Sequence, residues 1–172
     1  MKNVAVCILI GITALFFHSA YGADQDDMYK AELQKCIGGK VNLKKNTTPI
    51  KFIEVIKQEG GETVAYLFSS KELGISTKGY QGMVEVILVC DPKGRVLSIF
   101  VGENRETPAS LKKFQNGFKT EKWKNKKLGE AECETVTGAT FTSNAVKQGL
   151  KNIIRKLDDS GFFKKLKTEK ND

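Results

Sequence analysis

The sequence predicts a single α+β domain: an antiparallel sheet built from hairpins, with helices packed on one face. Two pairs of apolar, β-branched segments support this, 51–58 with 63–69 and 83–90 with 95–101, each joined by a short glycine-containing turn. The clearest amphipathic helical pattern comes later, at 143–157. Strands first and helices afterwards favour helices stacked on an antiparallel sheet. A chain of 172 residues can bury an apolar core.

The chain opens with the features of an export signal. An apolar run from Val4 to Phe17 is shorter than the roughly 20 residues that a membrane-spanning helix needs. Ala20 and Gly22 are small residues at the positions that a cleavage site requires, so residues 1–22 are expected to be a Sec-type signal peptide. The mature protein is then periplasmic or otherwise extracytoplasmic. An uncleaved segment would instead anchor it in a membrane.

Residues 23–49 are expected to form an N-terminal helix and a linker. The helix spans 26–36 and ends at Gly38-Gly39, because glycine commonly terminates helices. The following residues, 40–49, are mostly polar and are expected to be a connection without regular structure.

The second half of the chain is predicted to be helical and looping. Residues 107–118 form a short helix that begins at Thr107-Pro108, and Trp123 is expected to pack in the core. The helix at 143–157 has apolar residues at helical spacing with lysines between them. Residues 159–172 are expected to be a basic C-terminal tail of uncertain order.

The composition excludes several kinds of site. His18 is the single histidine and would be removed with the signal peptide, which excludes Ser-His-Asp triads, Cys-His pairs and histidine-ligated metals. Cys36, Cys90 and Cys133 would remain, without any C-x-x-C spacing. One disulfide and three free thiols are both compatible with this odd number. No metal site and no catalytic constellation is predicted.

The net charge is +8, from 28 Lys and Arg against 20 Asp and Glu. An exported basic protein is not expected to meet nucleic acid. The five lysines between residues 119 and 127 therefore favour a solvated face, or a patch for an acidic partner or an anionic membrane surface.

Three segments contain turn residues and small polar side chains that their local structure does not require. They are residues 79–82, 106–108 and 134–143. The last segment places hydroxyl groups at the start of a predicted helix, with Gly138 and Ala139 between them. Free N–H groups and the positive end of the helix dipole favour an anion there. Plain N-capping by Thr142 or Ser143 is the alternative interpretation.

Together these motifs resemble the FMN-binding domain family: Gly-Tyr-x-Gly before a strand, a hairpin, Glu-Thr-Pro, then Thr-Gly-Ala-Thr-x-Thr-Ser opening a helix. The family includes the C subunit of the sodium-translocating NADH:quinone reductase and the G subunit of the Rnf complex. The resemblance assigns residues 50–158 to this domain. In the family, a flavin transferase uses FAD and magnesium to join FMN to the last threonine of a D-x-x-(S/T)-G-A-(S/T) motif, which implies Thr140 here.

The resemblance implies the following cofactor-binding residues: Thr140, Thr137, Gly138, Ala139, Thr142, Ser143, Glu106, Thr107, Pro108 and Tyr80. Two departures from the family pattern stand out. Glu134 replaces the usual aspartate, and Ala109-Ser110-Leu111 replaces a Gly-Leu-Gly sequence.

The function implied is that of an exported flavoprotein that carries electrons through covalent FMN, rather than a stand-alone catalyst. It would act free or as a subunit of a membrane electron-transport complex, with redox donor and acceptor proteins as partners. The alternative function is a non-redox periplasmic binding or adaptor module with the same fold and no flavin, which the two departures motivate.

Overall fold

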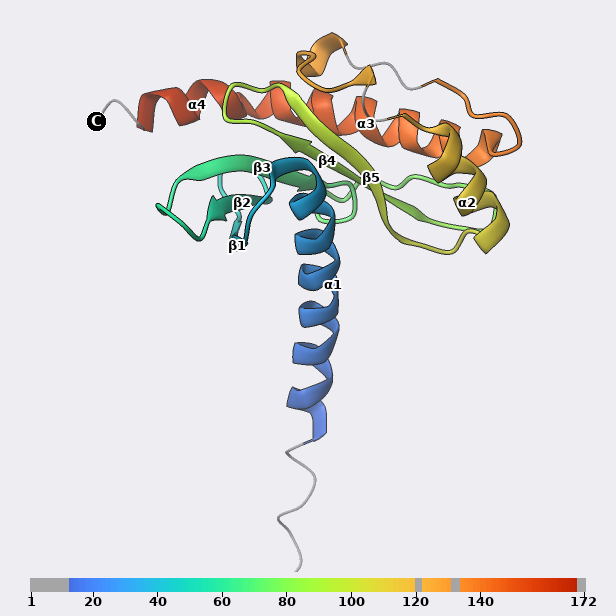
Figure 1. The fold of residues 1–172 in the computed structure, drawn as a ribbon, viewed down its shortest axis with the longest axis horizontal. Helices are drawn as coiled ribbons and strands as arrows, with labels where there is room; N and C mark the ends of the chain where they lie inside the picture. The colour runs from blue at the N-terminus through green and yellow to red at the C-terminus, as the bar shows by residue number, and fades with distance from the viewer. Residues whose placement is uncertain (1–12, 120–121, 131–133, 170–172) are drawn as a thin grey trace, which may run out of the picture.

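The structure is a computed structural model that describes residues 13–119, 122–130 and 134–169 (Figure 1). In chain order, its elements are α1 (Thr13–Ile37), β1 (Val41–Asn46), β2 (Phe52–Lys57), β3 (Thr63–Ser69), β4 (Val84–Cys90), β5 (Val96–Asn104), α2 (Pro108–Gly117), the 3-10 helix η2 (Leu128–Glu130), α3 (Thr140–Ser160) and α4 (Phe162–Glu169).

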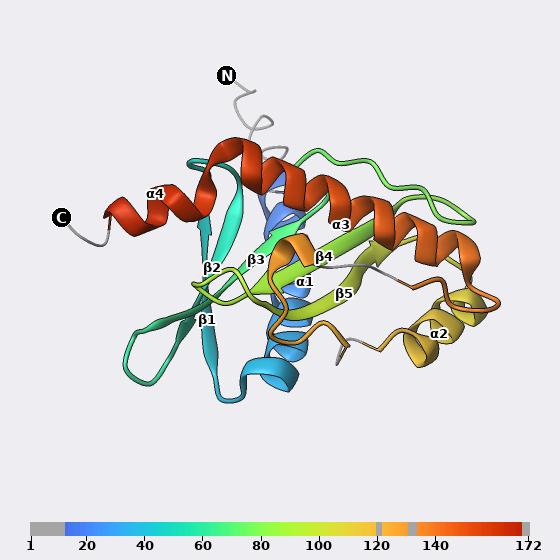
Figure 2. The same cartoon turned by 90° about the horizontal axis from the view of Figure 1, so that it is seen from above.

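The five strands form one sheet in the order β1-β2-β3-β4-β5, with every neighbouring pair antiparallel. Both predicted hairpins are present, as β2 with β3 and β4 with β5. The α+β class and the antiparallel sheet are therefore confirmed. Figure 2 shows α3 lying across the strands, with α2 beyond one end of the sheet.

The sheet is covered on both faces. Val86, Leu88 and Cys90 of β4 pack on the side of α3, whereas Ile87 and Val89 pack on the side of α1. All seven residues of β4 are buried, since a strand covered on both faces has no solvent side. The structure thus adds α1, on the opposite face, to the helices predicted on one face.

The helix α1 is longer than the predicted 26–36. It runs without a break from Thr13, inside the apolar segment, across the position expected for signal cleavage. On the sheet side, Tyr29 and Leu33 are buried, and the Tyr29 hydroxyl donates to Oε1 of the buried Glu85 at 2.9 Å. Within the described part of the chain, no helix combines the length and the apolar character needed to cross a membrane.

The connection predicted at 40–49 is wrong in part, because residues 41–46 form the edge strand β1. Val41 is buried and Leu43 is partly buried, with polar residues alternating between them. Two apolar residues give too weak an alternation to recognise in the sequence. The strand forms because β2 provides its hydrogen-bonding partner, with Val41 opposite Lys57.

The expected basic tail is also structured as far as Glu169. Gly161, with φ of +64°, ends α3 in the left-handed conformation and turns the chain into α4. Phe162 is then fully buried, with its ring edge-on to Phe52, Tyr66 and Phe68 at centroid distances of 4.8–5.4 Å. A single buried aromatic side chain therefore fixes the start of the C-terminal helix on the sheet.

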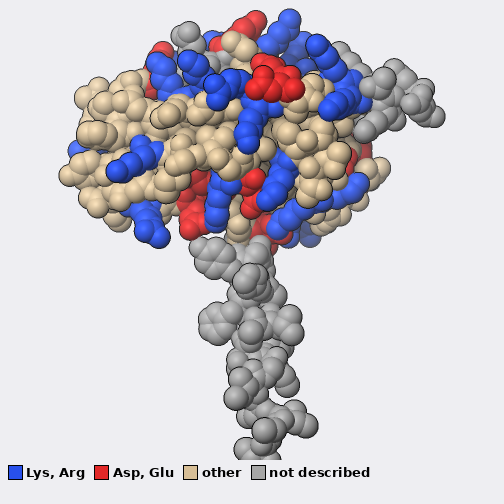
Figure 3. Space-filling model, turned by 180° about the vertical axis from the view of Figure 1, so that it is seen from behind, with Lys and Arg blue, Asp and Glu red and all other residues tan. Residues whose placement is uncertain are grey.

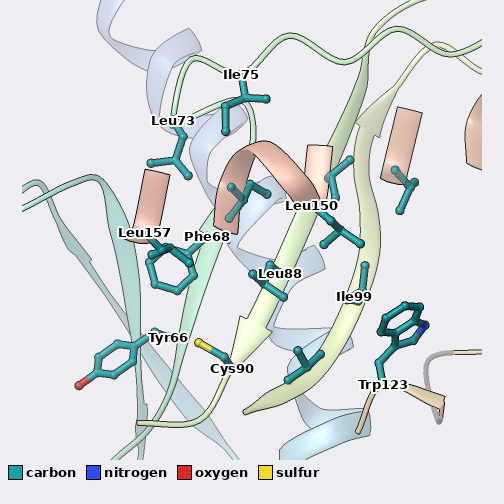
Figure 4. Packing of buried hydrophobic residues seen from close by; sticks show 14 of the residues in the cluster. Tyr66, Phe68, Leu73, Ile75, Leu88, Cys90, Ile99, Trp123, Leu150 and Leu157 are labelled. Atoms are coloured by element: carbon teal, nitrogen blue, oxygen red, sulfur yellow. The ribbon is translucent and has the colours of Figure 1, made fainter. Parts of the chain in front are cut away.

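Figure 4 shows the core between the sheet and α3, where Leu150 and Leu157 meet Leu88 and Phe68. Trp123 is buried in the same cluster, as predicted. Cys36 and Cys90 are free thiols, and burial raises the pKa of both. Cys133 lies outside the described residues.

Candidate functional site

The three segments singled out in the sequence meet at the carboxylate of Glu106. Its Oε1 accepts from the backbone N–H of Gln81 at 3.0 Å, and its Oε2 accepts from the hydroxyl of Thr142 at 2.6 Å. Glu106 and Thr142 are both buried. One side chain thus joins the 79–82 turn and the start of α2 to the first turn of α3.

The close packing around Glu106 explains Gly79. A Cβ atom placed there would lie 2.5 Å from Oε1 of Glu106 and 2.8 Å from a methyl group of Val84. Ser110 completes the contact between the helices, because its hydroxyl lies 3.2 Å from the Thr142 hydroxyl and 3.5 Å from Glu106 Oε2. In the sequence, Ser110 stands out only as part of a departure from the family pattern.

A compact turn leads into α3. The Ser143 hydroxyl accepts from Val136 N–H at 3.0 Å and donates to the carbonyl of Ala139 at 2.8 Å, while Ala139 N–H donates to the carbonyl of Val136 at 3.0 Å. Gly138 sits inside this turn with φ of +76°, a conformation that side-chain-bearing residues rarely adopt. The backbone geometry of this turn therefore favours glycine at position 138.

The N-cap of α3 is Ala139, which provides no side-chain hydrogen bond. The alternative interpretation, plain capping by Thr142 or Ser143, is wrong because Thr142 donates to Glu106 and Ser143 bridges the preceding turn. The first N–H groups of a helix have no acceptor within the helix. Because the Ala139 side chain does not cap them, these N–H groups are available to bind an anion.

Thr140 is exposed at this helix start and lines a hollow of about 290 Å³. Tyr80, Phe141, Ser110 and Lys113 line the same hollow. The Tyr80 and Phe141 rings contact each other at 5.6 Å between centroids, yet they are 59% and 61% exposed. Exposed aromatic rings beside a hydroxyl and a helix N-terminus are suited to a planar ligand that carries a phosphate.

A second, larger hollow of about 520 Å³ lies on the other side of Lys113. Thr137, Glu134, Lys122 and Trp123 line it. Lys122 Nζ donates to Glu134 Oε2 at 2.8 Å, and this hydrogen bond lowers the pKa of the Glu134 carboxyl. Thr137 and Thr140 therefore face different hollows.

Thr107 and Pro108 have roles in starting α2. The Thr107 hydroxyl accepts from Ser110 N–H at 3.2 Å as the N-cap, and Pro108 is the first helical residue. Thr107 also lines the smaller hollow. All five lysines between 119 and 127 are exposed, in agreement with a solvated face.

Sequence reasoning missed Phe141 and Lys113. Phe141 has a usable signal, because an aromatic residue at the second position of an amphipathic helix, off its apolar stripe, has no core to enter. Lys113 has no such signal in the sequence, since its place at the site depends on how α2 packs against the turn before α3.

Comparison with known proteins agrees with the geometry. Residues 79–155 match the FMN-binding domain, and this range includes all three segments. The chain is also 30% identical over 110 residues to a Clostridium ljungdahlii protein, the G subunit of the proton-translocating ferredoxin:NAD(+) oxidoreductase complex. That alignment covers 58% of this chain and 57% of the relative, so the chain spans little more than half of the relative's length. The resemblance seen in the sequence is thereby confirmed.

Proposed function

We propose that the FMN-binding domain at residues 79–155 makes this chain an electron-carrying flavoprotein with FMN joined to Thr140 through a phosphoester. The observation that supports this most is the position of Thr140. Its hydroxyl is exposed at a helix start whose cap is an alanine, directly after the left-handed Gly138 and beside the aromatic hollow.

The attachment reaction requires a flavin transferase that supplies FAD with magnesium. The Thr140 oxygen forms a bond to the phosphorus of the FMN half of FAD, the pyrophosphate P–O bond breaks, AMP leaves, and the hydroxyl proton passes to a base of the transferase. No electrons are exchanged in this step. The residues of the chain present the hydroxyl: Gly138 gives the turn its direction, and Ser143 and Glu106 fix the helix that follows.

The residues of the smaller hollow fit the rest of the group. Tyr80 and Phe141 offer exposed aromatic surface for the isoalloxazine ring, and Thr107 and Ser110 offer hydroxyl groups at the wall. FMN, when bound, would supply the redox chemistry by accepting electrons from a donor protein and passing them to an acceptor. The side chains of this chain would orient the ring and limit its contact with water.

The partners follow from the relative and from the charge. The relative is named as a subunit of an oxidoreductase complex, so we propose that this chain works in a membrane electron-transport complex or as a free carrier beside one. Its place would be periplasmic or extracytoplasmic, reached through the apolar N-terminal segment. Figure 3 shows Lys and Arg side chains interspersed with Asp and Glu on one face, and the net charge of +8 would favour the approach of an acidic redox partner.

The test is co-expression with a flavin transferase, followed by intact-mass measurement of the wild type, Thr140→Ala and the matched control Thr137→Ala. The wild type and Thr137→Ala should gain the mass of one FMN less one water, and Thr140→Ala should gain none. A wild type without added mass would remove the proposal and leave the alternative function, a flavin-free binding or adaptor module. Added mass on Thr140→Ala would show that the attachment residue is wrong.

A further inference from the structure

Lys113 occupies a distinctive place on α2. It lines both hollows and therefore forms the ridge between them. A Cβ atom placed on Gly138 would lie 3.4 Å from Lys113 Cδ and 3.7 Å from its ammonium nitrogen. The lysine thus lies over the left-handed turn that immediately precedes Thr140.

Two acidic side chains lie at or beside the hollows, and both have other partners. The oxygens of Glu106 accept from Gln81, Thr142 and Ser110, and Glu134 pairs with Lys122. The ion pairs found in residues 13–119, 122–130 and 134–169 do not include Lys113. The ammonium group of Lys113 thus lies beside the turn that leads into α3, next to the helix end where the dipole is positive as well.

An exposed ammonium group and the positive end of a helix, lying next to each other, favour binding of an anion between them. We propose that Lys113 binds the phosphate of the flavin ester on Thr140 and, by occupying the ridge, directs the ring into the hollow of Tyr80 and Phe141. This inference rests on the proposed attachment at Thr140. A phosphodiester keeps one negative charge, which matches the single ammonium group of Lys113. Lys113 is thus a positioning residue, because it acts on the phosphate and not on the redox-active ring.

Because Lys113 lies between the two hollows, its position can decide which of them the flavin ring enters. From the turn at Gly138, the ring could enter either the smaller aromatic hollow or the larger hollow lined by lysines and Glu134. Thr140 lines the aromatic hollow and not the larger one, so an ester on Thr140 whose phosphate is held by Lys113 would start on the aromatic side.

The experiment compares Lys113→Gln, Lys113→Arg and the control Lys112→Gln with the wild type. Lys112 is an exposed neighbour on α2 that lines neither hollow. Each purified protein is incubated with flavin transferase, FAD and magnesium, and the initial rate of covalent flavin incorporation is measured. The fluorescence anisotropy of the flavin is then measured after complete loading. Thermal melting checks that each fold is intact.

We expect Lys113→Gln to lower the initial rate about tenfold, equivalent to about 1.4 kcal/mol, and to lower the anisotropy of the loaded flavin. Lys113→Arg should restore both, and Lys112→Gln should behave as the wild type. Normal rate and anisotropy in Lys113→Gln would overturn the inference while leaving the proposed function in place. A slow rate with normal anisotropy would also overturn it, because Lys113 would then serve transferase recognition alone. A wild type that takes up no flavin would instead refute the proposed function itself.

Discussion

The hydrogen bond between Glu106 and Thr142 can be tested by a double-mutant cycle. The Thr142 hydroxyl donates to Glu106 Oε2 at 2.6 Å, between two buried side chains. A hydrogen bond to a charged group contributes about 1.5–3 kcal/mol. Glu106→Ala removes this acceptor and also the acceptor of Gln81 N–H at 3.0 Å. We therefore expect Glu106→Ala to lower the free energy of unfolding by about 3–5 kcal/mol.

Two milder variants isolate the pair. Thr142→Val keeps the shape of the side chain and removes only the donor, so it should cost about 2 kcal/mol. Glu106→Gln keeps an oxygen for Gln81 but removes the charge that faces Thr142, and it should cost about 1.5 kcal/mol. Because both changes remove the same interaction, the double variant should cost about 1–2 kcal/mol less than their sum.

The assay is urea unfolding followed by circular dichroism, with the slope of each transition checked against the wild type. If the cost of the double variant equals the sum of the two single costs to within about 0.5 kcal/mol, the two side chains act independently and the proposed hydrogen-bond coupling is refuted. The same variants can be assayed for flavin incorporation. If the rate falls in step with the loss of stability, the Glu106–Thr142 hydrogen bond also helps to position Thr140, since Glu106 orients the helix that carries it.

Three other variants test separate parts of the fold and the site. Gly138→Ala forces a side chain into a left-handed turn and should cost about 1–2 kcal/mol in thermal melts while slowing flavin incorporation; an unchanged rate would show that the turn is not needed. Phe162→Ala should cost about 3–5 kcal/mol in chemical unfolding, and a cost below about 1 kcal/mol would show that α4 is not packed on the sheet. At Glu54, burial alone would raise the carboxyl pKa, but the hydrogen bonds from Thr63 and Lys44 outweigh it and lower the pKa. Its contribution to stability is therefore present above the unfolded-state pKa and lost as the pH falls through the lower folded value. In an NMR titration, Thr63→Val should raise this pKa, and an unchanged value would contradict the assigned cause.

The sequence was informative where one periodicity dominates. The two hairpins and α3 combine β-branched runs or a long apolar stripe with glycine turns, and each appears close to its predicted place. The predicted start of α3 was three residues late, at 143, because the preceding threonines read as a loop with a cap. Elements stabilised mainly by a distant partner were missed, as β1 depends on β2 and α4 on the pocket around Phe162.

The candidate site divides in the same way. The turn at Gly138 and the hydroxyl groups at the start of a helix could be predicted, since their chemistry is local to one segment, whereas Thr140 itself was implied by the family resemblance. The meeting of Gln81, Glu106 and Thr142 could not, because it joins residues 25 and 36 positions apart. The sequence also gave no sign that Glu106 is buried and joins three segments of the chain.

The exposure of Thr140 has a consequence for the order of assembly. The contacts that shape its turn run between Val136, Ala139 and Ser143, and the helix behind it is held by Glu106 and Thr142. None of these contacts uses the Thr140 side chain. If FMN is attached to Thr140 as proposed, folding can therefore finish first, and the group can be added afterwards as a surface modification. Under that proposal, a cell could make and store the unloaded protein and set its redox capacity later, through the supply of flavin.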